Sequence, residues 1–201
     1  MLPGEPDHIT CPHCEGLLAL PTLLSGNTFS YRRWSDGYAC YPMLPQLEAV
    51  ALCEHCRKPF WTAQASRVEL DPQGWVRVRD DSPRARLFGN ETRLEYPGLA
   101  YLGWGPGAEG WLRAIEQGMP MPGQEVRFRL KAWWALNDAA RNGEPETPWH
   151  EQTNNLEILL DLLTDDEWLL AAEVLRALGR FSHSLRHLDQ GGDASSLTAL
   201  T

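Results

Sequence analysis

The motif CPHC at residues 11–14 returns as CEHC at residues 53–56. A C-x-x-C turn places two sulfurs on the same side of a tight loop, and two such turns supply the four thiolates of a tetrahedral zinc shell. Pro12 also fixes the backbone φ angle directly after the first sulfur. The pattern therefore predicts one metal site with four ligands: Cys11, Cys14, Cys53 and Cys56.

Other uses of paired cysteines fit this chain less well. A thioredoxin-type redox site needs one C-x-x-C between a strand and a helix, whereas this chain has two such pairs. The P-C-x-x-C of zinc deaminases and the H-E-x-x-H of zinc proteases are both absent. Four thiolates also leave no open position for a catalytic water. We therefore expect one structural Zn²⁺, with iron or a redox role for the thiols as the alternatives.

Three further side chains of ligand type accompany these motifs. His13 and His55 hold the same third position in the two motifs, and we expect them to point outward and to be chemically free. The fifth cysteine, Cys40, stands in YACYP at residues 38–42 and is interpreted as a small, partly buried apolar residue. A ligand role for it, or a reactive thiol, is the alternative.

The 38 residues between the two motifs contain turn signals rather than low-complexity sequence. Asp36-Gly37 predicts a type I′ hairpin between SYRRW at 30–34 and YACY at 38–41. Arginine beside aromatic residues is also how several folds hold single-stranded nucleic acid. The insertion therefore contains a candidate interaction surface, with a packed hairpin as the simpler interpretation; the surface residues are Arg32, Arg33, Trp34 and Tyr38.

A family resemblance rests on segments spread over the first 62 residues: CPHC, LLSGNTF, WSDG, YPMLP, CEHC and PFW. Together they resemble uncharacterised bacterial proteins in which an N-terminal rubredoxin-like zinc-ribbon module with four cysteines is followed by a helical, weakly tetratricopeptide-like region. The resemblance implies a fold and a metal, but no reaction. The chain departs from the ribbon pattern where Glu15 and Arg57 replace the usual glycine after each second cysteine, and in the length of its insertion.

The remainder of the chain divides into a strand region and a helical region. DPQG at 71–74 predicts a second hairpin between residues 68–70 and 75–79, followed by a loop rich in glycine, proline and aromatic residues. Apolar periodicity and capping signals then predict helices over 108–117, 124–141, 154–163, 164–178 and 181–188. Thr164 and Glu167 form a capping-box pattern, and Gly179 predicts the turn before the last helix.

Net charge narrows the set of partners. The chain carries −9, and residues 121–201 hold thirteen acidic and seven basic side chains. Such a surface repels phosphate backbones and anionic membranes at long range. No stretch approaches the roughly 18 apolar residues of a membrane helix, and the first ten residues lack the regions of a signal peptide. We therefore expect a soluble, cytoplasmic protein.

These observations predict an α+β protein: an N-terminal zinc ribbon with β-hairpins, followed by a C-terminal α-helical hairpin or bundle region. The expected divisions are a ribbon with an inserted hairpin over 1–62, a hairpin and Gly/Pro-rich loop region packed on it over 63–107, a helical region over 108–190, and a flexible tail over 191–201.

Three functions compete at this point. The first is a non-enzymatic zinc-binding adaptor or regulatory protein, whose acidic helical half binds a protein partner, a basic one being favoured. The second is a nucleic-acid-associated ribbon that uses the aromatic hairpin around Arg32 and Arg33. The third is an enzyme with its site in the aromatic loop 95–111, although no acid–base or nucleophile pattern supports it.

Overall fold

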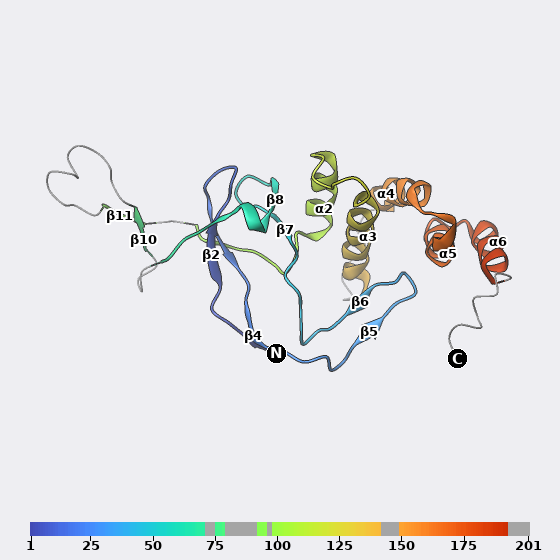
Figure 1. Cartoon of the computed structure of the whole chain (residues 1–201), viewed down its shortest axis with the longest axis horizontal. Coiled ribbons are helices and arrows are strands. Elements are labelled where there is room, and N and C mark those ends of the chain that lie inside the picture. Colours follow the sequence, from blue (N-terminus) through green and yellow to red (C-terminus); the bar gives the residue numbers. More distant parts are fainter. Residues whose placement is uncertain (71–74, 79–91, 96–97, 142–148, 193–201) are drawn as a thin grey trace. The chain divides into compact units, whose positions relative to one another are not determined.

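The computed structural model describes residues 1–70, 75–78, 92–95, 98–141 and 149–192. The chain forms two compact units that alternate along the sequence (Figure 1). The first combines Met1–Thr28 with Met43–Pro106, and the second combines Phe29–Pro42 with Gly107–Thr201. The segment between the two cysteine motifs thus contains a hairpin that belongs to the helical unit, whereas the sequence analysis places it in the N-terminal domain of residues 1–62.

The first unit is a set of short strands. Its largest sheet has the order β12-β3-β2-β9, with β3 antiparallel to β2 and parallel to β12. The strands are β1 (Leu2–Pro3), β2 (Asp7–Thr10), β3 (Leu17–Leu20), β4 (Leu23–Ser25), β7 (Val50–Leu52), β8 (Pro59–Trp61), β9 (Ser66–Arg67), β10 (Trp75–Val78), β11 (Thr92–Glu95) and β12 (Ala100–Tyr101). A short 3-10 helix, η1 (Thr62–Gln64), follows β8.

The core of this unit lies directly beside the cysteine motifs. β3 is buried along its whole length, as is β7, and β8 contributes Phe60. Cys11 and Cys53 are members of the same buried cluster as Ile9, Leu18 and Phe60. The sulfurs and the apolar core are therefore one structure, since each motif is the turn of a hairpin whose strands fill the core.

One predicted hairpin is wrong. The sequence analysis pairs residues 75–79 with residues 68–70, but β10 pairs with β11, with Trp75 opposite Glu95 and Val78 opposite Thr92. The preceding strand β9 is taken up by β2, with Ile9 opposite Arg67. Val68, the first residue of the predicted hairpin, likewise donates its N–H to the His8 oxygen of β2 at 2.9 Å, so the chain continues along the free edge of β2 at this point. The predicted turn at 71–74 lies outside the described residues.

The second unit contains the helices and one small hairpin. Its elements are β5 (Arg32–Arg33), β6 (Ala39–Cys40), α2 (Gly107–Glu116), α3 (Glu125–Arg141), α4 (Trp149–Leu162), η2 (Asp165–Glu167), α5 (Trp168–Ala177) and α6 (Phe181–Gly192). The predicted helices are confirmed to within a few residues. Within the described part of the chain, no helix combines the length and the hydropathy that crossing a membrane requires.

Polar contacts fix the register of α3 against α4. Arg129 is 8% exposed, and its guanidinium donates to Glu125 and to the Asn155 side-chain oxygen. The Asn155 amide donates in return to the backbone oxygen of Arg129, at 3.0 Å. A buried cation with several acceptors avoids most of the desolvation penalty, so these helices are joined at one defined point. Trp133, Leu156, Leu159 and Val174 form the adjacent apolar core.

The last two helices form the expected αα-hairpin. The capping box of Thr164 and Glu167 is present at η2, and Gly179 takes a φ of +73° between α5 and α6. Ser184 is buried and donates to the backbone oxygen of Ala172 at 2.7 Å, which lets the two helices approach closely. Phe181 and Leu185 on α6 remain more than 60% exposed.

A buried carboxylate joins the inserted hairpin to α3. Asp36 is 4% exposed and accepts hydrogen bonds from the backbone N–H of Tyr38, from the Asn137 amide and from Arg141. The Arg141 guanidinium also lies over the Trp34 and Tyr38 rings, with centroid distances of 4.9 and 4.4 Å. Gly37, at φ +79°, closes the turn. The predicted type I′ geometry is wrong, because Asp36 does not share a positive φ and the turn spans three residues between Trp34 and Tyr38. These contacts explain why residues 29–42 pack with the helices.

Candidate metal centre

The two cysteine motifs have the same backbone geometry. Cys11 N–H donates to the Gly16 oxygen and Cys53 N–H to the Lys58 oxygen, both at 3.0 Å. One step further, the N–H of Glu15 donates to the Cys11 oxygen and that of Arg57 to the Cys53 oxygen, both at 2.9 Å. The sequence repeat is therefore also a structural repeat, with one knuckle between β2 and β3 and the other between β7 and β8.

The two residues that depart from the ribbon pattern adopt the conformation that normally favours glycine. Glu15 has φ +58° and Arg57 has φ +55°. Left-handed backbone costs an ordinary residue on the order of 1 kcal/mol. Arg57 is held in place by an ion pair with Glu54 at 2.9 Å. The knuckle geometry is thus imposed by the surrounding hydrogen bonds although glycine is missing.

The four predicted ligand atoms converge. The Sγ atoms of Cys11 and Cys56 lie 3.8 Å apart and those of Cys14 and Cys53 lie 3.7 Å apart. All four sulfurs lie within 4.8 Å of one another. Four sulfurs placed about 2.3 Å from a central zinc ion in a tetrahedron would be separated by about 3.8 Å. The donor set and its spacing therefore fit a tetrahedral thiolate metal site.

Burial disfavours the negatively charged thiolate forms of the cysteines unless a cation is bound. It raises the pKa of the Cys53 thiol to about 12, and it also raises the pKa of Cys11. The pKa of Cys56 is lowered: burial raises it, but hydrogen bonds from the Lys58 backbone and from the other thiols outweigh that effect. A bound metal ion favours the thiolate forms that these surroundings otherwise oppose.

Each knuckle is clamped by the histidine of the other. His13 Nε2 donates to the Pro59 backbone oxygen at 3.1 Å, and His55 Nε2 donates to the Leu17 backbone oxygen at 3.0 Å. A carbonyl oxygen only accepts, so each Nε2 carries the proton. Pro59 and Leu17 both stand three residues after the second cysteine of their motif. The two clamps are therefore equivalent under the repeat.

The expectation that these histidines are chemically free is wrong, although neither belongs to the group of potential metal ligands. Their shared third position was the signal available in the sequence. A repeat that keeps a histidine as well as the two cysteines indicates that both histidines have the same kind of partner. In the structure this partner is a backbone oxygen of the other hairpin.

Gly16 provides the space for one clamp. A Cβ atom at Gly16 would lie 2.3 Å from Cδ2 of His55, well inside van der Waals contact. The equivalent residue of the second knuckle is Lys58. The φ angle of Gly16 is not in the left-handed region, so backbone conformation does not require glycine here. The His55 imidazole requires it instead, because any larger side chain would collide with the ring.

The predicted interaction residues divide into two groups. Arg32 and Arg33 are exposed, and neither forms an ion pair with any described residue. Trp34 and Tyr38 are half-buried against Arg141, and Tyr38 also contacts the Trp134 ring at a centroid distance of 5.6 Å. Burial, followed by the charge of Asp138, raises the pKa of Tyr38 to about 12.

The remaining candidates form no common site with the cysteines. Cys40 lies on β6 in the helical unit, at intermediate burial, as its sequence suggests. The aromatic residues of the loop 95–111 divide between the two units: Tyr101 and Trp104 belong to the first, and Trp111 packs edge-on against Phe128 in the second, at 5.0 Å between centroids. Residues 96–97 of this loop are outside the described residues.

No protein-family model, curated protein or solved structure matches this chain. The resemblance to ribbon-bearing bacterial proteins and to a tetratricopeptide repeat therefore stays a prediction.

The metal site makes a direct prediction about stoichiometry. We expect the purified protein to bind one zinc per chain, and Cys11→Ser and Cys53→Ser each to lose the metal and the folded state of the first unit, because a tetrahedral shell loses a buried ligand. Metal content by mass spectrometry and hydrogen exchange measure both effects. The control Cys40→Ser should keep one zinc, and full folding of the wild type without metal would contradict the assignment.

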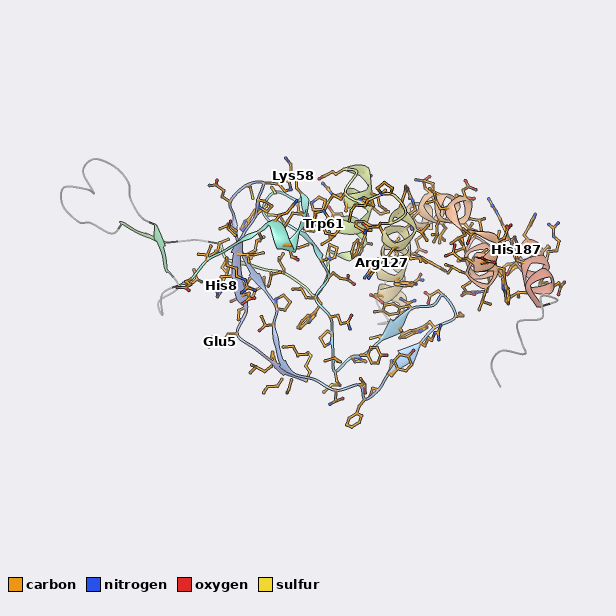
Figure 2. The ribbon with its side chains drawn as sticks, in the orientation of Figure 1. Glu5, His8, Lys58, Trp61, Arg127 and His187 are labelled. Carbon is orange, nitrogen blue, oxygen red and sulfur yellow. The ribbon has the colours of Figure 1, made fainter. Side chains whose placement is uncertain are left out.

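The histidine clamps predict a graded loss of metal affinity. His13→Ala and His55→Ala should each weaken zinc retention roughly fivefold in competition with a chelator, because each removes one hydrogen bond between the knuckles. Gly16→Ala should reproduce the His55→Ala effect by displacing the ring. His8→Ala on β2 (Figure 2) is the matched control. Wild-type zinc affinity in both clamp variants would refute the reciprocal clamp.

Proposed function

We propose that this chain is a non-enzymatic zinc-binding protein that acts by binding a protein partner through its helical unit. Four converging sulfurs match the ligand set of a closed tetrahedral zinc site, which favours a structural ion that supports the first unit. The helical unit then supplies the interaction surface. A partner with basic and apolar side chains fits best, for the reason that follows.

The observation that carries this proposal is an acidic face with exposed leucines where α4 passes into α5. We define the acidic face by Asp161, Leu162, Asp165, Asp166 and Leu169. The two leucines are 37% and 58% exposed. All three aspartates are exposed, and none forms an ion pair with a described residue.

Helix capping explains part of this composition but not all of it. Acidic residues beside the first turn of α5 stabilise the positive end of that helix. Capping gives no reason for Leu169, which follows these acidic residues in the first turn of α5, to remain exposed. Apolar contact surrounded by unpaired charge of one sign is typical of a surface that selects an oppositely charged partner.

A basic amphipathic peptide of alternating lysine and leucine turns is a direct probe of the acidic face. We expect Asp165→Asn/Asp166→Asn and, separately, Leu169→Ser to weaken its binding about fivefold, measured by fluorescence anisotropy with the zinc-loaded protein. The control Glu116→Gln/Asp189→Asn removes the same charge elsewhere in the helical unit. Equal weakening by the control would show long-range attraction only and would contradict the proposed surface.

A second candidate function has its own observation. Phe29, Tyr31 and Tyr41 are 74%, 47% and 37% exposed, and the two tyrosine rings lie 4.8 Å apart between centroids. They accompany the exposed Arg32 and Arg33. Stacking rings beside guanidinium groups that pair with no described residue suit single-stranded nucleic acid. The exposed pair Tyr31 and Tyr41 therefore supplies the candidate stacking surface, rather than the half-buried Trp34 and Tyr38.

This alternative predicts salt-dependent binding of a single-stranded oligothymidine. Arg32→Ala/Arg33→Ala should reduce the slope of log affinity against log salt by roughly 1.4, since about 0.7 is contributed by each lost phosphate contact. Arg127→Ala/Arg186→Ala, at two exposed positions of the helical unit, is the control with the same loss of charge. No anisotropy change at low salt would remove nucleic acid from consideration.

A further inference from the structure

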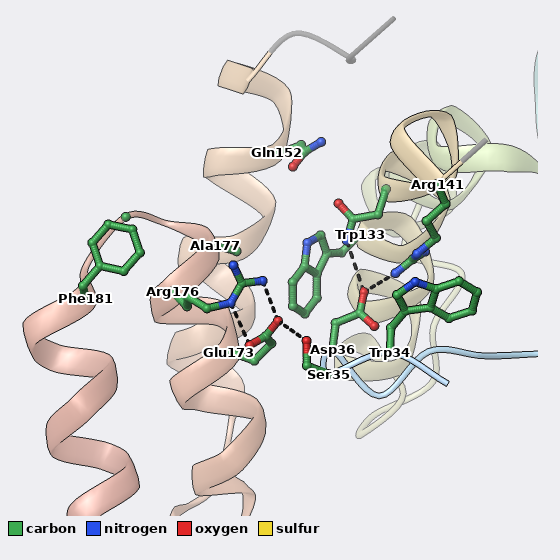
Figure 3. A pocket seen from close by; sticks show the side chains of 12 residues that line it. Trp34, Ser35, Asp36, Trp133, Arg141, Gln152, Glu173, Arg176, Ala177 and Phe181 are labelled. Carbon is green, nitrogen blue, oxygen red and sulfur yellow. Dashed lines mark hydrogen bonds and ion pairs between the residues drawn. The ribbon is translucent and has the colours of Figure 1, made fainter. Parts of the chain in front are cut away.

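A second potential binding site lies within the helical unit and is not explained by partner binding. It is a cavity of about 520 Å³ between the hairpin turn at Trp34–Asp36 and helices α3 to α6 (Figure 3). This volume falls in the range of small-molecule sites. Trp133 forms part of its wall, and Phe181, which is 63% exposed, also lines it.

The Trp133 side chain carries the polar group that indicates a ligand site. This residue is 2% exposed, yet its indole Nε1–H donates no hydrogen bond to any residue that the structure describes. No fully buried side-chain nitrogen or oxygen in the described chain lacks a partner, so this N–H is not fully enclosed by protein. Because Trp133 lines the cavity, its N–H is available to an acceptor inside it.

Gln152 provides the complementary pair of groups. Its half-buried side chain lines the same cavity and forms no hydrogen bond with a described residue. Figure 3 shows it on α4, on the side of the cavity opposite Glu173. A glutamine amide offers both a donor and an acceptor, which match the carbonyl and N–H of another amide.

The charges around the cavity are already balanced. Arg141 pairs with Asp36, and Arg176 pairs with Glu173 through Nε at 2.9 Å and Nη2 at 2.6 Å. Ser35 also donates to Glu173 at 2.8 Å. The pKa of Glu173 is lowered chiefly by the Arg176 hydrogen bond, so the carboxylate stays charged at neutral pH. A charged ligand would have to displace one of these pairs, whereas a neutral one leaves both intact.

We propose that this cavity binds a neutral, planar ring compound that carries an amide edge, such as a heteroaromatic lactam. The ring lies against the Trp133 indole, the lactam carbonyl accepts from the Trp133 Nε1–H, and the Gln152 amide pairs with the lactam group. The chemistry is that of recognition alone, with no covalent step.

Isoquinolin-1(2H)-one is the probe, with isoquinoline as the ring that lacks the amide and benzoate as the charged comparator. Titration of the ¹⁵N-labelled, zinc-loaded protein should shift the Trp133 indole resonance with the lactam, and each comparator should bind at least about fivefold more weakly. The Trp133 resonance is assigned by its loss in Trp133→Phe.

Two variants and a control complete the test. Gln152→Leu and Trp133→Phe should each weaken lactam binding roughly five- to tenfold, while Gln117→Leu on the surface should not change it. The Trp34 and Trp134 indole resonances show whether each variant keeps its fold. The inference is overturned by equal affinity for lactam and isoquinoline, by unchanged lactam affinity in both variants, or by the absence of a saturable shift in the wild type.

Discussion

Four thiol groups that meet within 4.8 Å are the constraint on which the first unit depends. Metal ligation requires thiolates, and several negative charges at this distance repel one another strongly unless a cation lies between them. Each thiol is also part of a hairpin turn, and the strands of those hairpins form the apolar core. Metal binding and folding are consequently expected to be coupled, with the histidine clamps adding a second link between the knuckles.

The helical unit depends on a different buried group. Asp36 has three hydrogen-bond donors around its carboxylate, and the Trp134 indole donates to its backbone oxygen at 3.1 Å. These contacts hold the hairpin against α3 and place Ser35 beside Glu173 on α5. The cavity proposed above exists because a segment located between the two cysteine motifs supplies one of its walls. Residues 29–42 of the insertion are therefore part of the helical unit's architecture.

Local sequence signals were reliable where a few neighbouring residues decide the structure. The capping box at Thr164, the turn at Gly179 and the helices of the C-terminal half all follow from contacts three or four residues apart. The cysteine spacing likewise predicted which sulfurs converge. Asn137 shows the limit, because its side chain donates to Asp36, 101 residues away in the sequence, where no local pattern could indicate the partner.

The sequence by itself determined which four sulfurs converge, the helical half and the presence of a turn at Gly37, since each follows from residue spacing and local backbone preference. Only the tertiary structure decided which unit that hairpin joins, which strand pairs with β10 and which backbone oxygens the two histidines reach. Those choices depend on which buried polar groups find partners when distant segments meet. A carboxylate such as Asp36 is tolerated inside a protein only where donors from elsewhere in the chain surround it.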